Sequence, residues 1–198
     1  MFQQLLCLKG TQRPLIQLAL VGCKQRLSSI APLITTLNKV ENQLQVLLIP
    51  KLNLGEDGFD AICRLVEKSN SLRNLDISWN HTLSSQTHQL FEALGKNRVL
   101  QYLNICMLAI DPKNELRGLK KFIKFNKRLL HCNFTGLLKT QKQVIGVIKA
   151  IKVNLTLLAV HLSHTPVITK SKRLQAYIRK KLGMNSIKSK PKNRQYTS

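Results

Sequence analysis

A leucine-led phrase recurs six times along this chain, at intervals of 28 or 29 residues. It opens at Leu15, Leu44, Leu72, Leu100, Leu129 and Leu157. A repeat of this length is typical of a solenoid, because a unit this short cannot bury a core by itself and must stack on its neighbours. The spacing therefore predicts a stacked array rather than a closed globule, and it favours the binding of another macromolecule.

Each phrase places apolar residues at its first, fourth and sixth positions. In a chain that is 43% hydrophobic, independent placement would fill all of these positions about once in several million trials. The second and third apolar positions alternate with the period of a short strand that has one buried face, so the residue between them is expected on the opposite face. The six triplets are Leu15, Leu18, Leu20; Leu44, Leu47, Ile49; Leu72, Leu75, Ile77; Leu100, Leu103, Ile105; Leu129, Cys132, Phe134; and Leu157, Val160, Leu162.

Between the phrases the apolar period changes to that of a helix. In three units an apolar pair four residues apart, and so on one helix face, is followed three residues later by an asparagine that ends the last turn. These asparagines are Asn97, Asn126 and Asn154. The pattern predicts helices at about 27–40, 57–68, 86–96, 114–126, 140–153 and 168–182, so each unit is one strand followed by one helix.

Two phrases carry a family resemblance. LRNLDISWN, from Leu72 to Asn80, and LIQLALVGC, from Leu15 to Cys23, resemble the consensus of leucine-rich repeats. Units of 28 and 29 residues with a full helix resemble the ribonuclease-inhibitor-like subclass, which includes Ran GTPase-activating proteins. The resemblance covers about residues 13–183. It implies an α/β, right-handed leucine-rich-repeat horseshoe solenoid of about six strand–helix units, with a parallel sheet on the concave face and mostly protein partners.

The chain departs from the family at the residue that supports the turn after each strand. Asn80 and Cys23 keep a residue whose side chain supports this turn in the family, so the remaining turns must satisfy their backbone groups in another way or be looser. No local motif matches a ribonuclease-binding surface or the catalytic arginine of a GTPase activator, and neither is assigned here. The other units have Leu52, Leu108, Leu137 and Thr165 at this position.

The charge of the chain is strongly uneven. The net charge is +23, and residues 116–198 hold 20 of the 32 Lys and Arg residues but none of the nine Asp and Glu residues. Such a field concentrates polyanions, whether RNA, an anionic lipid surface or an acidic protein segment. The alternative is an outer face that is basic only because it is solvated. The predicted polyanion-binding residues are Arg117, Lys120, Lys121, Lys124, Lys127, Arg179, Lys180, Lys181, Lys188, Lys190, Lys192 and Arg194.

Composition also divides the chain into two parts. Residues 184–198 contain too little apolar material to fold, which predicts a basic disordered tail. Residues 1–183 form the predicted leucine-rich repeat solenoid.

The concave face supplies the other candidate site. Trp, Tyr and Arg on a rigid surface dominate interface energies, although Trp79 has an alternative role as a ring packed over the strand edge. Comparable positions in neighbouring units are apolar, which favours a partner. The predicted partner-binding residues are Arg73, Asp76, Trp79, Tyr102, Asn104, His131, Asn133 and His161.

The sequence gives little support to catalysis, and we expect no enzyme activity, catalytic residues, metal site or cofactor. The five cysteines show no metal-ligand spacing and are expected to be buried free thiols. The chain shows no secretory leader and no membrane-spanning run, which favours a cytoplasmic or nuclear location. The sequence therefore predicts a non-catalytic scaffold that binds a protein through its concave sheet. The alternatives are RNA or acidic-surface binding through the basic half, and a GTPase-activator-like regulator.

Overall fold

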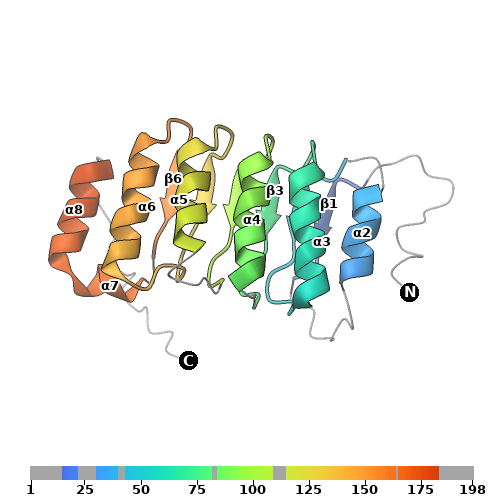
Figure 1. The fold of residues 1–198 in the computed structure, drawn as a ribbon, viewed down its shortest axis with the longest axis horizontal. Coiled ribbons are helices and arrows are strands. Elements are labelled where there is room, and N and C mark those ends of the chain that lie inside the picture. Colours follow the sequence, from blue (N-terminus) through green and yellow to red (C-terminus); the bar gives the residue numbers. More distant parts are fainter. Residues whose placement is uncertain are drawn as a thin grey trace, which may run out of the picture.

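The computed structural model describes residues 15–21, 30–39, 43–81, 84–108, 115–163 and 165–182. In these residues short strands and helices alternate along the chain (Figure 1). The strands are β1 (Gln17–Ala19), β2 (Val46–Leu48), β3 (Asn74–Asp76), β4 (Tyr102–Asn104), β5 (His131–Asn133) and β6 (Ala159–His161). The helices are α2 (Ala31–Lys39), α3 (Gly55–Lys68), α4 (Ser84–Lys96), α5 (Glu115–Phe125), α6 (Gln141–Val153), α7 (Pro166–Lys170) and α8 (Lys172–Leu182).

The strands form one parallel sheet in chain order, from β1 to β6. The second apolar residue of every phrase pairs with its counterpart in the next unit, so Leu47 lies opposite Leu75, and Leu103 lies opposite Cys132. One unit therefore advances the chain by one strand, and the 28- or 29-residue period sets the register. The predicted leucine-rich-repeat horseshoe, with six parallel strands alternating with helices, is confirmed.

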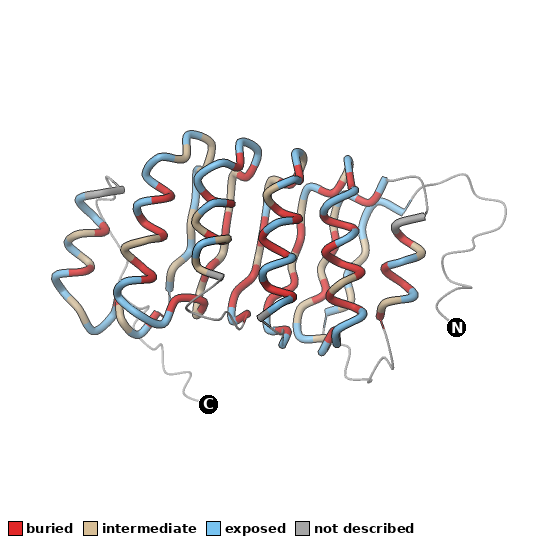
Figure 2. The backbone as a smooth tube through the Cα atoms, in the orientation of Figure 1, coloured by how far each residue is buried: buried red, intermediate tan, exposed pale blue. Residues whose placement is uncertain are grey.

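The apolar triplets of the middle units belong to a core between the sheet and the helical layer, and Figure 2 shows buried stretches in both layers. Leu47, Leu72 and Phe134 are fully buried in middle units, whereas Leu15 in the first described unit is 37% exposed. This gradient follows from stacking, because a unit at the end of the described array has a neighbour on only one side.

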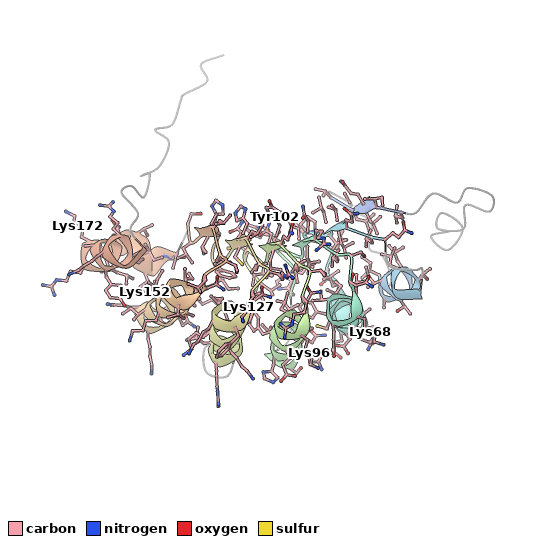
Figure 3. The ribbon with its side chains drawn as sticks, turned by 90° about the horizontal axis from the view of Figure 1, so that it is seen from above. Lys68, Lys96, Tyr102, Lys127, Lys152 and Lys172 are labelled. Atoms are coloured by element: carbon pink, nitrogen blue, oxygen red, sulfur yellow. The ribbon has the colours of Figure 1, made fainter. Side chains whose placement is uncertain are left out.

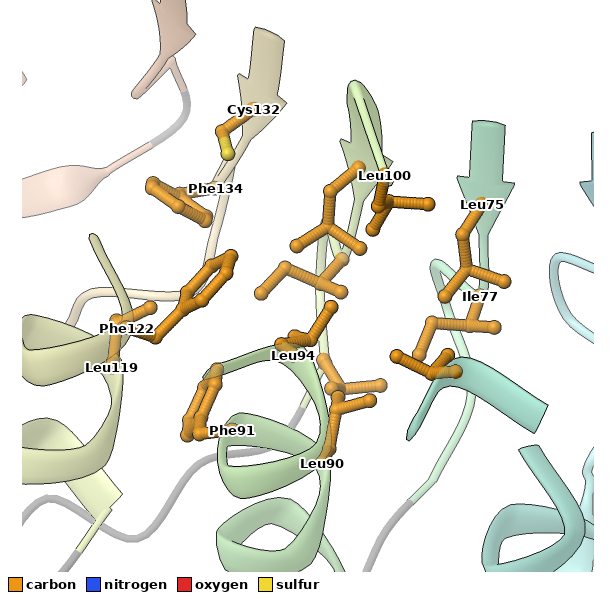
Figure 4. Packing of buried hydrophobic residues seen from close by; sticks show 14 of the residues in the cluster. Leu75, Ile77, Leu90, Phe91, Leu94, Leu100, Leu119, Phe122, Cys132 and Phe134 are labelled. Carbon is orange, nitrogen blue, oxygen red and sulfur yellow. The ribbon is translucent and has the colours of Figure 1, made fainter. Parts of the chain in front are cut away.

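Aromatic rings fill the core between the central strands and helices. Phe91 lies on the side of α4 that faces α5, beside Gly118, and Phe122 of α5 points toward the side chains of the strands (Figure 4). Both rings are only 2% exposed. A buried side chain of this size stabilises the fold by about 1.5–3 kcal/mol through removal of apolar area from water.

The predicted helix ends are close to the observed ones, with one correction. The prediction of a single helix at 168–182 is wrong, because the chain breaks at Ser171 between α7 and α8. Ser171 is extended, and its Oγ accepts a hydrogen bond from the backbone N–H of Leu174 at 3.2 Å. Serine thus caps the start of α8, as such residues commonly do at a helix N-terminus.

The asparagines after the helices do more than end them. The Oδ1 of Asn97 accepts hydrogen bonds from the N–H groups of Val99 and Leu100, at 2.9 and 2.8 Å. Its Nδ2 donates to the carbonyl of Val66 in the preceding unit at 2.6 Å. Asn126 and Asn154 repeat this pattern. A column of amides therefore links each helix end to the next strand and to the adjacent unit.

Two of the turns that lack an asparagine or cysteine at the supporting position, those of Leu108 and Leu137, close through their backbone. The N–H groups of Leu108 and Leu137 donate to carbonyls three residues earlier, at 3.3 and 3.1 Å. Both leucine side chains are buried. In contrast, Asn80 donates to Ile77 of its own turn and accepts from the N–H of Leu52 in the preceding unit. Cys23 lies outside the described residues.

Candidate functional site

The sheet lines the inner side of the curved array and the helices lie outside it (Figure 3). The middle residue of each strand points into the core, so its two neighbours face the concave side. Strand pairing aligns these outward residues in two rows across the sheet. The first row is Gln17, Val46, Asn74, Tyr102, His131 and Ala159, and the second is Ala19, Leu48, Asp76, Asn104, Asn133 and His161.

A hollow of about 320 Å³ lies over β2 to β6 on this face. It brings together six of the eight predicted partner-binding residues, namely Asp76, Tyr102, Asn104, His131, Asn133 and His161. Arg73 and Trp79 do not line it. The structure adds six residues to the lining, namely Leu48, Asn74, Leu75, Leu103, Thr135 and Ser163. Asn74 could have been found from the sequence, because it occupies the same repeat position as Tyr102 and His131.

Three polar residues of the hollow shape the strand ends. The side-chain oxygens of Asp76, Asn104 and Asn133 accept hydrogen bonds from backbone N–H groups two residues later, at 2.9, 3.1 and 3.0 Å. This is the Asx-turn arrangement, which replaces a lost ladder bond at the end of a strand. The Nδ2 of Asn104 also donates to Asp76 Oδ2 at 2.8 Å. These bonds hold the side chains in place and share the charge of the single carboxylate in the hollow.

Three rings form the middle of the hollow. Tyr102 and His131 meet edge to face with centroids 6.0 Å apart, and His131 and His161 lie 4.7 Å apart. Burial, together with the neighbouring His161, lowers the pKa of His131. The His131 ring is therefore neutral at neutral pH, and its buried Nε2 makes no hydrogen bond within the described residues. Tyr102 remains 44% exposed and faces the concave side (Figure 3).

Trp79 belongs to a separate row along the strand exits. Lys51, Trp79, Met107 and Gly136 occupy equivalent repeat positions and all adopt left-handed backbone conformations, with φ between 56° and 70°. The N–H groups of Lys51, Trp79 and Met107 each donate to the next unit at 2.9 Å, which extends the ladder past the strands. Trp79 is 54% exposed, so its ring is available at the edge of the sheet rather than packed beneath it.

Arg73 directly precedes β3 and so lies at the opposite end of the strands from Trp79. Its Nη1 donates to the carbonyl of Val99 at 3.2 Å, which ties it to the loop of the following unit. The eight predicted partner-binding residues therefore divide into a hollow and two flanking positions.

The predicted basic stripe lies on the outer helices. Arg117, Lys120, Lys121 and Lys124 line a groove between α5 and α6, and Lys142 and Lys149 of α6 complete it. Lys142 and Lys149 were not predicted from the sequence, because they lie one repeat later, on a helix that was interpreted only in terms of core packing. Lys127, Arg179 and Lys180 are exposed outside the groove. The side chain of Lys181 and the residues Lys188, Lys190, Lys192 and Arg194 lie outside the described part of the chain.

Three thiols in the described residues, Cys63, Cys106 and Cys132, are free and buried. Burial, assisted by Asp60, raises the pKa of Cys63 to about 12, and burial raises that of Cys132 well above its usual value. Both are therefore protonated and unreactive at neutral pH. Cys7 and Cys23 fall outside the description.

Neither a metal centre nor a membrane span is found where the structure is described. No three His, Cys, Asp or Glu side chains among the described residues come together so that they could hold a metal ion. No described helix is long and apolar enough to cross a membrane.

The fold defines the chain as a leucine-rich-repeat-like solenoid. Comparison with protein-family models and with curated proteins gives no match. Among solved structures, the chain is similar to a tropomodulin C-terminal domain from Caenorhabditis elegans, with 14% identity and a TM-score of 0.42. That match covers 63% of this chain and 91% of the other.

Proposed function

We propose that this chain is a non-catalytic scaffold of the ribonuclease-inhibitor-like kind, which binds a protein partner through the hollow of its concave sheet. The observation that carries the proposal is the contact series Tyr102–His131–His161 on three adjacent strands. Aromatic rings on a rigid surface give large contact area at a low cost in conformational entropy. The surrounding amides are already fixed by their turns, so little ordering is needed on binding.

The chemistry of the hollow indicates what the partner presents. Its His131 ring is uncharged at neutral pH, its one carboxylate accepts hydrogen bonds from neighbouring residues, and apolar Leu48 lies at its edge. The hollow is shallow and has room for one or two side chains rather than for an enclosed small molecule. The proposed partner therefore inserts an apolar or aromatic anchor with a hydrogen-bonding tip, while Trp79 and Met107 contribute along the rim.

The experiment is capture of partners from nuclease-treated lysate by the wild type and matched variants. Tyr102→Ala removes a ring from the hollow, and Phe125→Ala removes an exposed ring from the outer helix α5. The proposal expects that a partner protein is captured despite nuclease treatment. Its recovery should fall by about tenfold or more with Tyr102→Ala and stay unchanged with Phe125→Ala. Equal recovery by both variants would contradict it.

Trp79 is tested by a separate substitution that protects the backbone. Glycine suits the left-handed conformation at this position, where φ is 60°, so Trp79→Gly removes the ring without adding backbone strain. We expect weaker capture with unfolding free energy changed by less than about 1 kcal/mol. Unchanged capture would exclude the ring from the interface.

A cytoplasmic or nuclear location suits this function, because buried free thiols such as Cys63 and Cys132 are typical of a reducing compartment.

The GTPase-activator alternative has less support. Such an activator would present an arginine free to reach a bound nucleotide, whereas the guanidinium of Arg73 contacts the carbonyl of Val99. Arg26, a second arginine that could play this role, lies outside the described residues. We expect no stimulation of GTP hydrolysis by a small GTPase, and stimulation lost on Arg73→Ala would reverse that conclusion.

The basic half supports a second function, recognition of an acidic macromolecule, on a face separate from the hollow. Six basic residues line the groove between α5 and α6, on the outer helical layer. The two functions require different faces and can be lost independently.

A further inference from the structure

The groove between α5 and α6 has a shape that charge alone does not explain. Its volume is about 900 Å³, nearly three times that of the concave hollow. Arg117, Lys120, Lys121 and Lys124 form one wall, and Lys142 and Lys149 lie on the other. Ile145, Ala150 and Val153 of α6 supply apolar surface within it. An apolar surface between two basic walls indicates a ligand that is itself both apolar and acidic.

A glycine, Gly146, lies in the lining of the groove. A side chain on Gly146 of α6 would meet the Cδ of Lys120, 3.1 Å from the position of its Cβ, so the lysine stem covers this helix. The equivalent residue of the preceding unit is Gly118, and there the Cβ of Phe91 occupies the space at 3.3 Å. Phe91 is 2% exposed. A buried ring closes the α4–α5 junction, whereas a flexible lysine covers the α5–α6 junction, and a lysine stem can swing aside.

Among the residues whose side chains the structure describes, none of the six cations of the groove forms an ion pair. The ion pairs of the described residues, Lys96 with Glu67 and His88 with Glu92, lie on α3 and α4. No acidic residue follows Glu115 in the sequence. Repulsion among unpaired like charges is relieved when acidic groups bind between them, which favours an anionic ligand electrostatically.

The apolar surface decides between the anionic ligands. A nucleic acid strand gains affinity by stacking bases on aromatic rings, and Phe125 is the one exposed ring of the described α5 and α6 residues. A membrane is broad and meets helix crests rather than a groove between them. A third helix, in contrast, lays its apolar face into such a groove and presents acidic side chains to both walls.

We propose that the α5–α6 groove binds an acidic amphipathic helix of another protein. The helices that form it have 11 and 13 residues, so a bound helix of about three turns matches its length of roughly 16–20 Å. Among the described helices the acidic one is α3, but Phe59, Ile62 and Val66 on its apolar face are buried in the core. The described part of a second folded copy therefore offers no such helix. The proposal rests on the second function above and is independent of the concave hollow.

The test is fluorescence anisotropy with a labelled, 13-residue helical peptide that carries one leucine stripe flanked by glutamates. A scrambled peptide of the same composition keeps the charge but loses the stripe. At physiological salt we expect the amphipathic peptide to bind the full chain about tenfold or more tightly than the scrambled one. Equal binding of the two peptides would overturn the proposal, because it would leave only charge.

Two variants separate shape from charge. Gly146→Leu fills the groove, displaces a flexible lysine stem and favours the helix, so the fold is retained. The affinity for the amphipathic peptide should fall by about tenfold. The double variant Lys121→Glu, Lys149→Glu lowers the affinity for the same peptide by about tenfold or more, whereas Lys68→Glu on α3 leaves this affinity unchanged. Wild-type affinity for the peptide in Gly146→Leu would refute the groove.

Single-stranded RNA and vesicles of anionic phospholipid serve as competing ligands. If either binds at least as tightly as the amphipathic peptide and is weakened by Gly146→Leu, the groove belongs to that ligand and the proposal is wrong. If the peptide binds more tightly and only its affinity responds to Gly146→Leu, the proposal is supported. Loss of concave-face capture has no bearing on either outcome, because Tyr102→Ala leaves the groove unchanged.

Discussion

Replacing Asn97 with alanine removes four hydrogen bonds from one small side chain. The Oδ1 accepts from the N–H groups of Val99 and Leu100, and the Nδ2 donates to the carbonyls of Val66 and Ser69. Asn97 is 3% exposed and Leu100 is 1% exposed. Water cannot easily replace the lost partners at such a site, so the backbone groups of two units are left without hydrogen bonds.

The expected loss follows from the two best-buried bonds. The N–H of Leu100 and the carbonyl of Val66 each lose a partner at 2.8 and 2.6 Å, and an unsatisfied buried polar group costs about 1–3 kcal/mol. Asn97→Ala should therefore lower the free energy of unfolding by about 2–6 kcal/mol. In a chain of this size that corresponds to a fall in Tm of roughly 4–24 °C.

The assay is chemical denaturation followed by far-UV circular dichroism, with two matched variants. Ser69 occupies the equivalent position one unit earlier, and its Oγ accepts from the N–H groups of Ser71 and Leu72. Asn97→Ser keeps this acceptor and should recover about half of the loss. Arg98→Ala, at the exposed neighbouring position, should cost no more than about 0.5 kcal/mol. The reasoning is refuted if Asn97→Ala is as mild as Arg98→Ala, or if serine is as damaging as alanine.

Three further outcomes are expected. Gly136→Ala should lower the free energy of unfolding by about 1–2 kcal/mol, because φ is 70° there and the new Cβ meets Met107 Sδ. Adding Met107→Ala should remove this contact but not the backbone strain. An unchanged free energy of unfolding in Gly136→Ala would count against backbone strain at this position. The free energy of unfolding should fall as pH drops below about 6.5, because the lowered pKa of His131 means that the unfolded chain binds a proton at this residue before the folded chain does. His131→Phe should flatten this part of the pH profile. An unchanged slope in the variant would show that His131 is not the cause. In a variant with Cys7 and Cys23 replaced by serine, a thiol reagent should label the native protein slowly and the unfolded protein rapidly, because Cys63, Cys106 and Cys132 are buried. Rapid labelling of the native protein would contradict the burial of these thiols.

The strand register could be predicted from the sequence because one physical requirement sets it. Leu47, Leu75 and Leu103 must all face the core, and a slip of one residue would expose every one of them. The helix break at Ser171 could not be predicted in the same way. A serine inside a helical period is compatible with an uninterrupted helix, and its capping role depends on how α7 and α8 pack against α6.

The candidate site was predictable where it follows the repeat and was missed where it depends on neighbours. Tyr102 and His161 were found because they alternate with core positions. The turn bonds of Asp76 and Asn104 were missed, because an exposed polar residue in a strand looks the same in sequence whether it binds a partner or its own backbone. The groove was missed as a shape because Gly146 is informative only beside Lys120 of another helix.

The most direct test of partner binding in the hollow is site-specific photo-crosslinking in cells. A benzophenone amino acid replaces Tyr102 on the concave sheet or, as the control, Phe125 on the outer helix α5; both side chains are exposed. We predict a protein adduct at position 102 that resists nuclease and is absent at position 125. An adduct formed only at position 125, or a position-102 adduct removed by nuclease, would contradict protein binding through the concave sheet.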